Sequence, residues 1–337
     1  FELGDSEDEF LHFTEKMENG NIAKKVRIFF ADERGSLPNN YDERIAIIQY
    51  LAGEGYQIFL ATKQLNSRTI ERENEYKEIL KAYWGYDSFK ELKMYKDIET
   101  LGKETIEVSQ AQIIDDIIEQ SENSIQGQSF RDVYVTSSTG SGKSVMFQIP
   151  ALYLANKFKD DGFLTIVISP LIGLMDDQVK SMELRNISNA KTIHSNLSQM
   201  EKEDIISGVQ AGTVDILYIS TETLQSRADI GMLIGQRRVG LLVVDEAHIV
   251  TTWGKSFRAD YWYMGSYLAK MRKKQTFPIV TFTATAIYGG KEDMYLETRD
   301  SLNMVNPIAY FGYVKRDDIL MCVQSSQKEF TKYSREY

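Results

Sequence analysis

A short stretch rich in glycine and serine, SSTGSGKS at residues 137–144, has the residue types needed to hold phosphate groups. It follows an apolar run that ends at Thr136 and precedes a helical pattern, so it would connect a strand to a helix N-terminus. Backbone N–H groups in such a loop point at an anion, the lysine reaches the terminal phosphates, and the serine after it ligates Mg²⁺. The alternative is a glycine/serine turn before a capped helix. The sequence predicts a nucleotide phosphate site made of Thr139, Gly140, Ser141, Gly142, Lys143 and Ser144.

Two adjacent carboxylates follow a second apolar run, in the segment LLVVDEAH at residues 241–248. Buried acids at the end of a strand are costly unless they serve a metal ion or a proton. We expect Asp245 to hold Mg²⁺ together with Ser144, and Glu246 to orient and polarise a water molecule for attack on a phosphate. Because the pair shares a chain with a phosphate loop, it predicts ATP hydrolysis, with Lys143 as a further catalytic residue.

A parallel sheet is the element that would position these segments. From about Val108 onward, apolar β-branched runs alternate with helical stretches, and runs that are apolar on both faces are typical of buried parallel strands. The predicted strands are Val133–Thr136, Thr165–Ser169, Ile216–Ser220, Leu241–Val244 and Ile279–Phe282. Ligands of such α/β sheets bind at the carboxyl ends of the strands, which is where both polar segments lie.

The order of these segments resembles that of the RecQ family of superfamily 2 helicases. Asp245 to His248 is similar to the DEAH-type motif II, and TWGKSFRADY at 252–261 resembles the aromatic-rich loop of that family. Further matches in chain order are VMFQIPAL at 145–152, ISPLIGLMDDQV at 168–179 (motif Ia), YISTE at 218–222 (motif Ib) and TATA at 283–286 (motif III). The likeness covers roughly residues 108–316. It implies an α/β, RecA-like P-loop NTPase domain and an ATP-dependent DNA helicase or translocase of 3′ to 5′ polarity.

The resemblance also implies roles for further residues. His248 joins the catalytic set, and Gln110 would read the adenine edge. The implied nucleic-acid contacts are Ser169, Pro170, Thr221, Trp253, Phe257 and Arg258, and the implied coupling residues are Thr283 and Thr285. Other interpretations stay open: a helix-surface glutamine, hydroxyls that cap helices, aromatic rings that pack in the core, and a solvated arginine.

Three positions depart from the RecQ pattern. Ahead of Gln110, where the family carries an aromatic residue and an arginine, this chain has Ile106 and Glu107, and Lys255 replaces the histidine of the aromatic-rich loop. The single cysteine, Cys322, leaves no Cys cluster for the zinc-binding domain of the family.

Composition limits the partners. A net charge of -10 argues against a protein that coats nucleic acid by bulk positive charge, so contacts with DNA must be local. No apolar run approaches the ~20 residues of a membrane-spanning helix. We expect ATP and Mg²⁺ as cofactors, single-stranded or partly duplex DNA as a partner, no membrane, and a cytoplasmic location that is nucleoid-associated in a prokaryote.

The predicted organisation has four parts. Residues 1–20 hold seven acidic residues and one lysine, which favours a solvated tail over a segment that mimics nucleic acid or docks on a partner. Residues 21–105 form an accessory region, with strands at Val26–Phe30 and Gly55–Thr62, a helix at Tyr41–Ala52 and a helical connector over Asn66–Tyr95. Residues 106–310 form the RecA-like lobe, and 311–337 begin a second lobe or a linker.

Turnover of ATP would require a second RecA-like lobe, in the same longer chain or in trans, that this chain alone is expected to lack. We expect a protein partner that binds through the N-terminal region, and a setting in DNA repair, recombination or genome defence. A nucleotide- and DNA-sensing regulatory module of a larger complex, without unwinding activity, is the alternative.

Overall fold

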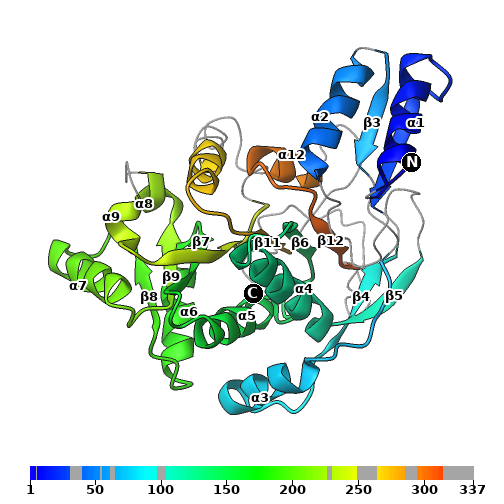
Figure 1. The fold of residues 1–337 in the computed structure, drawn as a ribbon. Helices are drawn as coiled ribbons and strands as arrows, with labels where there is room; N and C mark the ends of the chain where they lie inside the picture. The colour runs from blue at the N-terminus through cyan, green and yellow to red at the C-terminus, as the bar shows by residue number, and fades with distance from the viewer. Residues whose placement is uncertain are drawn as a thin grey trace, which may run out of the picture.

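The main body of the protein is a seven-stranded, all-parallel sheet, in the strand order β12-β6-β11-β10-β7-β9-β8 (Figure 1). The computed structural model describes residues 1–4, 6–30, 40–53, 55–60, 65–96, 104–225, 230–248, 264–284 and 294–313. The strands are β6 (Val133–Thr136), β7 (Phe163–Ser169), β8 (Ala190–Ile193), β9 (Ile216–Ser220), β10 (Arg238–Val244), β11 (Ile279–Thr283) and β12 (Ile308–Phe311). All five predicted strands are present in this sheet.

Helices cover both faces of the sheet, which explains why its strands are apolar on both sides. On one face lie α4 (Gln110–Ile125), α5 (Lys143–Lys157) and α6 (Ile172–Glu183). On the other lie α7 (Gln199–Gln210), α9 (Gly231–Ile234), the helical residues 264–272 and α12 (Met294–Ser301). Along β7, Val167 packs into the first layer while Ile166 and Ile168 pack into the second. The predicted α/β, RecA-like fold is confirmed.

A small α/β unit forms the N-terminus, and the prediction of a solvated tail over residues 1–20 is wrong. Its parallel strands are β1 (Glu2–Leu3), β2 (Lys25–Phe30) and β3 (Gln57–Leu60), with helices α1 (Glu7–Glu18) and α2 (Tyr41–Ala52). Helix α1 buries Phe10, Phe13 and Met17, which recur at the i, i+3, i+7 spacing of one helix face. The acidic residues occupy the remaining, exposed face, so the charge count alone did not indicate disorder.

The segment predicted as a helical connector over Asn66–Tyr95 is only partly helical. It contains α3 (Glu73–Trp84) and then β4 (Glu91–Tyr95), which pairs antiparallel with β5 (Thr105–Ser109). We call this pair the β4–β5 hairpin. It leads directly into α4, and its strand β4 also contacts the end of the large sheet, where Met94 forms a bridge with Gly312.

Ion pairs fix the accessory region to helix α4. Arg68 bonds both Asp115, at 2.9 Å, and Asp116, and Arg72 bonds Asp115 and Glu122, each at 2.9 Å. Both aspartates are buried, so each needs these partners to offset the loss of hydration. The segment that holds Arg68 and Arg72 therefore packs against the lobe. Within the described residues, no helix is both long and apolar enough to cross a membrane.

Candidate nucleotide-binding site

The predicted phosphate loop lies where the sequence placed it, between the carboxyl end of β6 and the first residue of α5. Gly140 and Gly142 both have φ of +83°, a left-handed conformation that glycine adopts without strain. A Cβ atom on Gly142 would also lie 2.6 Å from Nε2 of Gln110. The loop thus depends on glycine at position 142 for its backbone angle and for the room it leaves.

The side chains of the loop converge on one another and leave its tip open. Nζ of Lys143 donates to the carbonyl oxygen of Ser137 at 3.4 Å, and the hydroxyls of Ser137 and Ser141 lie 2.7 Å apart. Oγ of Ser144 accepts a hydrogen bond from Nε2 of Gln178 at 2.9 Å. Thr139 and Gly140 are exposed at the tip. An anion can therefore approach the loop, and the lysine is held beside it by a carbonyl group of the loop itself.

Gln110 is the first residue of α4, and its side chain bonds the phosphate loop. Its Nε2 donates to the carbonyl oxygen of Ser141 at 2.7 Å, and its Oε1 accepts from the backbone N–H of Lys90 at 3.1 Å. The residue is only 4% exposed, so its interpretation as a helix-surface glutamine is wrong. Contact with adenine stays a prediction for this residue.

The β4–β5 hairpin changes which residues lie ahead of Gln110. Along the chain these are Ile106 and Glu107, but the N–H of Gln110 bonds the carbonyl oxygen of Lys90 at 3.0 Å, because β4 and β5 pair along their length and bring the two residues together at the open end of the hairpin. An aromatic residue and a cation, Phe89 and Lys90, therefore precede Gln110 in space, and Nζ of Lys90 lies 3.4 Å from the carbonyl oxygen of Gly140. Lys90 was not among the predicted site residues, because it meets Gln110 only through the pairing of β4 with β5.

The two carboxylates of residues 245 and 246 follow β10 at the same edge of the sheet as the phosphate loop. Asp245 is 6% exposed, and its Oδ1 accepts the backbone N–H of Glu246 at 2.9 Å. Burial, followed by the charge of Glu246, raises the pKa of Asp245 to about 6. Glu246 has φ of +49°, a left-handed conformation that costs a non-glycine residue roughly 1 to 2 kcal/mol. Strain and a shifted pKa at neighbouring positions are typical of functional sites.

His248 connects this acidic pair to β11. Its Nδ1 lies 3.2 Å from Oε2 of Glu246 and 3.2 Å from Oγ1 of Thr283, the last residue of β11. The hydrogen bond from His248 holds the pKa of Glu246 below its usual range. Glu246 is thus kept ionised near neutral pH, as a residue that polarises water must be. The structure brings together Glu246, His248 and Thr283, whereas Thr285 lies outside the described residues.

The predicted nucleic-acid contacts fall in two groups. Ser169 ends β7, Pro170 follows it, and Thr221 begins α8 (Thr221–Gln225) directly after β9. The hydroxyl of Ser169 is buried without a hydrogen-bond partner in the described part of the chain, so it does not cap a helix there. Trp253, Phe257 and Arg258 lie outside the described residues. The first group occupies the same edge of the sheet as the phosphate loop, because all these strands are parallel.

Ser144 and Asp245 suit a magnesium ion. A hydroxyl and a carboxylate offer oxygen ligands, which Mg²⁺ prefers, and the ion usually takes only one or two protein ligands besides phosphate oxygens and water. Ser144 follows β6 and Asp245 follows β10, two strands of one parallel sheet that are separated by β11, and both residues lie at its carboxyl edge. The charge of Lys143 acts on Asp245 in the direction that lowers the pKa of this acid.

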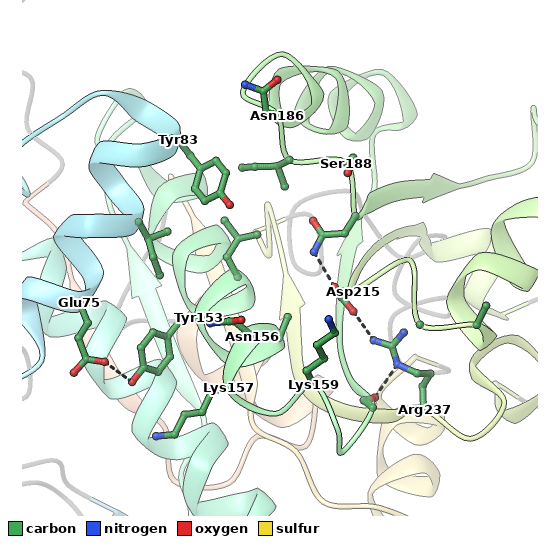
Figure 2. A pocket seen from close by; sticks show the side chains of 18 of the residues that line it. Glu75, Tyr83, Tyr153, Asn156, Lys157, Lys159, Asn186, Ser188, Asp215 and Arg237 are labelled. Atoms are coloured by element: carbon green, nitrogen blue, oxygen red, sulfur yellow. Dashed lines mark hydrogen bonds and ion pairs between the residues drawn. The ribbon is translucent and has the colours of Figure 1, made fainter.

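A cavity of about 970 Å³ lies at the opposite edge of the sheet, between α3, α5 and the loops that lead into the strands (Figure 2). Gly162 precedes β7, Asp215 precedes β9, and Arg237 precedes β10. Arg237 is already engaged there, since its guanidinium bonds Asp215 at 2.7 Å and four backbone carbonyl groups. Because this cavity and the phosphate loop lie at opposite edges of the sheet, they are separate sites.

The raised pKa of Asp245 predicts that Asp245→Asn stabilises the nucleotide-free protein. Because the folded pKa is about 6 and the ordinary value is 3.8, ionisation costs the fold stability as pH rises through this window. A neutral amide avoids that cost, which has an upper limit of about 3 kcal/mol. We expect the melting temperature to rise by several degrees at pH 7.5 and by less at pH 5, in thermal unfolding without Mg²⁺. A lower melting temperature at pH 7.5 would contradict the assigned burial cost.

Known proteins resemble this chain over the same segment. The family model described as DEAD/DEAH box helicase matches residues 107–293. The chain is 34% identical over 212 residues to "ATP-dependent DNA helicase RecQ" of Synechocystis sp., covering 62% of this chain and 37% of that protein. It is 29% identical over 250 residues to "ATP-dependent DNA helicase Q5" of Mus musculus, covering 73% of this chain and 21% of that protein.

Solved structures resemble the chain more distantly. The DEAD-box helicase Mss116 bound to ssRNA and UDP-BeF aligns with a TM-score of 0.44 and 16% identity, over 59% of this chain and 38% of that one. The chain thus spans well under half the length of the relatives it matches.

Proposed function

The chain belongs to the DEAD/DEAH box helicase family, and from this we propose that it is the ATP-binding lobe of a RecQ-like DNA helicase. In this proposal the lobe hydrolyses ATP and couples hydrolysis to movement along single-stranded DNA with 3′ to 5′ polarity. The observation that carries it is that the phosphate loop with Lys143 and the acidic pair Asp245 and Glu246 lie at the same carboxyl edge of one parallel sheet, near enough for the charge of Lys143 to act on both acids. We further propose that residues 106–310 form this lobe.

The hydrolysis proposed here assigns one task to each group. The N–H groups of the loop and Lys143 bind the β and γ phosphates, and Ser144 and Asp245 hold Mg²⁺, which when bound neutralises phosphate charge. Glu246 orients a water molecule and accepts its proton as the water oxygen bonds the γ phosphorus. The bond from that phosphorus to the bridging oxygen of ADP breaks, and the products are ADP and inorganic phosphate.

Gln110 and the hairpin supply the other side of the proposed nucleotide site. Lys90 extends toward Gly140 of the loop, where an ammonium group would meet a phosphate. Tyr86 is 62% exposed and lies four residues before Lys90, so we propose that its ring contacts the adenine face. In this proposal Tyr86 and Lys90 supply the aromatic ring and the cation that are missing at Ile106 and Glu107.

DNA would be held mostly through its phosphates. In this proposal Ser169, Thr221 and the backbone after Pro170 contact the strand without reading its sequence, which suits an acidic protein that must translocate. Trp253, Phe257 and Arg258 would add base stacking and a further phosphate contact. His248 and Thr283 would carry the signal between DNA and Glu246 together with Thr285. We also propose that a second RecA-like lobe completes the enzyme and that the N-terminal unit binds a protein partner. The proposed setting is DNA repair, recombination or genome defence, in the cytoplasm or the nucleoid.

Strand displacement tests this function. The protein in its natural length should separate a partial duplex with a 3′ single-stranded overhang when Mg²⁺ and ATP are both present, and should leave a 5′ overhang substrate paired. Nucleotide and DNA binding without displacement of either substrate would favour the alternative, a nucleotide- and DNA-sensing module. A failure to bind Mg·ATP would contradict both.

Lys90 gives a narrower prediction. Lys90→Ala should weaken Mg·ATP binding by about 3- to 10-fold, because an exposed ammonium group near phosphate contributes on the order of 1 kcal/mol. Isothermal titration would measure the dissociation constant. Lys159→Ala is the matched control, since Lys159 is an exposed lysine that lines the cavity at the opposite edge. Equal affinities of the two variants would remove Lys90 from the site.

A further inference from the structure

A row of hydrogen-bonded side chains leads from the phosphate loop into the interior of the lobe. Nε2 of Gln178 donates to Oγ of Ser144 at 2.9 Å, and Oε1 of Gln178 accepts from Nε2 of Gln148 at 2.9 Å. The same Nε2 of Gln148 donates to the hydroxyl of Tyr218 at 3.0 Å, and that hydroxyl contacts Sδ of Met182 at 3.8 Å. We call Ser144, Gln178, Gln148 and Tyr218 the amide relay.

The relay joins three elements that are distant in sequence. Ser144 and Gln148 lie one turn apart on α5, Gln178 lies on α6, and Tyr218 lies on β9. Gln148 is 3% exposed and Tyr218 is 1% exposed. Polar groups at such depth must be paired, and each broken pair would leave a donor or acceptor without a partner. A change in the hydrogen bonding of one member of the relay should therefore alter the hydrogen bonds of the others.

The direction of these bonds bears on metal binding at Ser144. A serine hydroxyl has two lone pairs and one hydrogen, and Gln178 occupies one of the lone pairs. The second lone pair is thereby directed elsewhere and is left for Mg²⁺. Withdrawal of electron density from Oγ by a cation would weaken the bond from Gln178, so metal binding and the position of the glutamine amide are linked.

The far end of the relay meets elements that lead to the proposed DNA contacts. Gln178 and Met182 lie on α6, which begins directly after the segment that holds Pro170. Tyr218 lies on β9, which ends one residue before Thr221. The relay thus connects the phosphate loop with both segments by a route that does not pass through His248 and Thr283.

We propose that Gln178 is a positioning residue for Ser144, and that Gln178, Gln148 and Tyr218 transmit the Mg²⁺-nucleotide state of the phosphate loop to α6 and β9. The inference rests on the proposed function, because it requires nucleotide at this loop. Its consequence is that DNA affinity and nucleotide state are linked inside this lobe as well as through the acidic pair.

Met182 provides the reporter for a test on the protein labelled with ¹³C at its methionine methyl groups. Titration with ADP in the presence of Mg²⁺ should shift the Met182 methyl resonance, which the spectrum of Met182→Leu identifies. In Gln178→Leu this shift should disappear. Mg²⁺ strengthens ADP binding, and the Mg²⁺ concentration that gives half of this effect should rise by about 3- to 10-fold in the variant. ADP binding without Mg²⁺ should stay as in the unchanged protein.

Tyr218→Phe separates the two halves of the proposal and covers the case in which Gln178→Leu does not fold. It removes one oxygen atom and leaves the bond between Gln178 and Ser144, so the Mg²⁺ requirement should be normal while the Met182 response is lost. The change in single-stranded DNA affinity on adding Mg·ADP should also shrink at least 3-fold. Gln210→Leu, at the end of α7, is the control and should behave as the unchanged protein in each measurement.

The possible results distinguish a failure of the relay from a failure of the proposed function on which it rests. If the unchanged protein binds no ADP, the proposed function is wrong. If it binds Mg·ADP but the Met182 methyl resonance does not shift, the relay is wrong and the nucleotide site is retained. The same holds if both relay variants give the shift and the Mg²⁺ dependence of the unchanged protein.

Discussion

Glu246→Gln should slow steady-state ATP hydrolysis at least ~100-fold while Mg·ATP and DNA binding persist. The amide keeps the size of the side chain but cannot take a proton from the attacking water. In the structure the hydrogen bond from His248 holds the pKa of Glu246 below its usual range, so the side chain carries the negative charge that the amide would remove. Steady-state turnover and equilibrium binding, measured on one preparation of the natural-length protein, would separate chemistry from binding.

The control for this variant is Glu203→Gln, which makes the same change at an exposed acid on α7. It should turn over as the unchanged protein does. Near-normal hydrolysis by Glu246→Gln would move the role of base to another group, for which the buried Asp245 is the next candidate.

Lys143→Ala should weaken Mg·ATP binding at least ~30-fold, which corresponds to about 2 kcal/mol for the loss of one partner of a close charge pair. The backbone N–H groups of the loop orient the phosphates but cannot supply a full positive charge. In the nucleotide-free protein the ammonium group is held by the carbonyl oxygen of Ser137 at 3.4 Å, a contact that is easily exchanged for a phosphate. Titration calorimetry with a slowly hydrolysed ATP analogue would measure the loss.

Two controls make this result specific. Lys143→Arg keeps the charge but not the compact shape, so intermediate affinity would show that shape also matters. Unchanged affinity in Lys143→Ala, with an unaltered thermal transition, would contradict the assignment of the phosphate loop.

The buried strands were predictable from sequence, and the exposed ones were not. Strands β6, β7, β9, β10 and β11 are covered on both faces, so each is a continuous apolar run. The edge strand β8 reads Ala-Lys-Thr-Ile and is buried only at its two ends, and half of β12 is partly exposed. The polar centre of β8 does not distinguish a strand from a loop, and β12 is a short apolar run, Ile-Ala-Tyr-Phe, that was not among the predicted strands.

The same physical limit applies to the candidate site. Residues adjacent in sequence, such as Asp245 and Glu246, could be found because their spacing is fixed by the chain. Lys90 and Gln110 are brought together by the hairpin, and Gln178 meets Ser144 through the packing of α6 on α5. Nothing local in the sequence encodes these contacts, because they depend on tertiary pairing.

The junction between the β4–β5 hairpin and the end of β12 has a consequence for the order of folding. The hairpin pairs residues that are near in sequence, so it can form within microseconds. Gly312, by contrast, bonds Thr136 across 176 positions of the chain, and Tyr313 donates to the carbonyl oxygen of Lys93 at 2.8 Å. Contacts so distant in sequence close slowly. The hairpin therefore forms early and offers an unpaired edge. The docking of Gly312 between the hairpin and β6 should be the last step of assembly. Hydrogen exchange at the amide of Gly312 during folding would time this step.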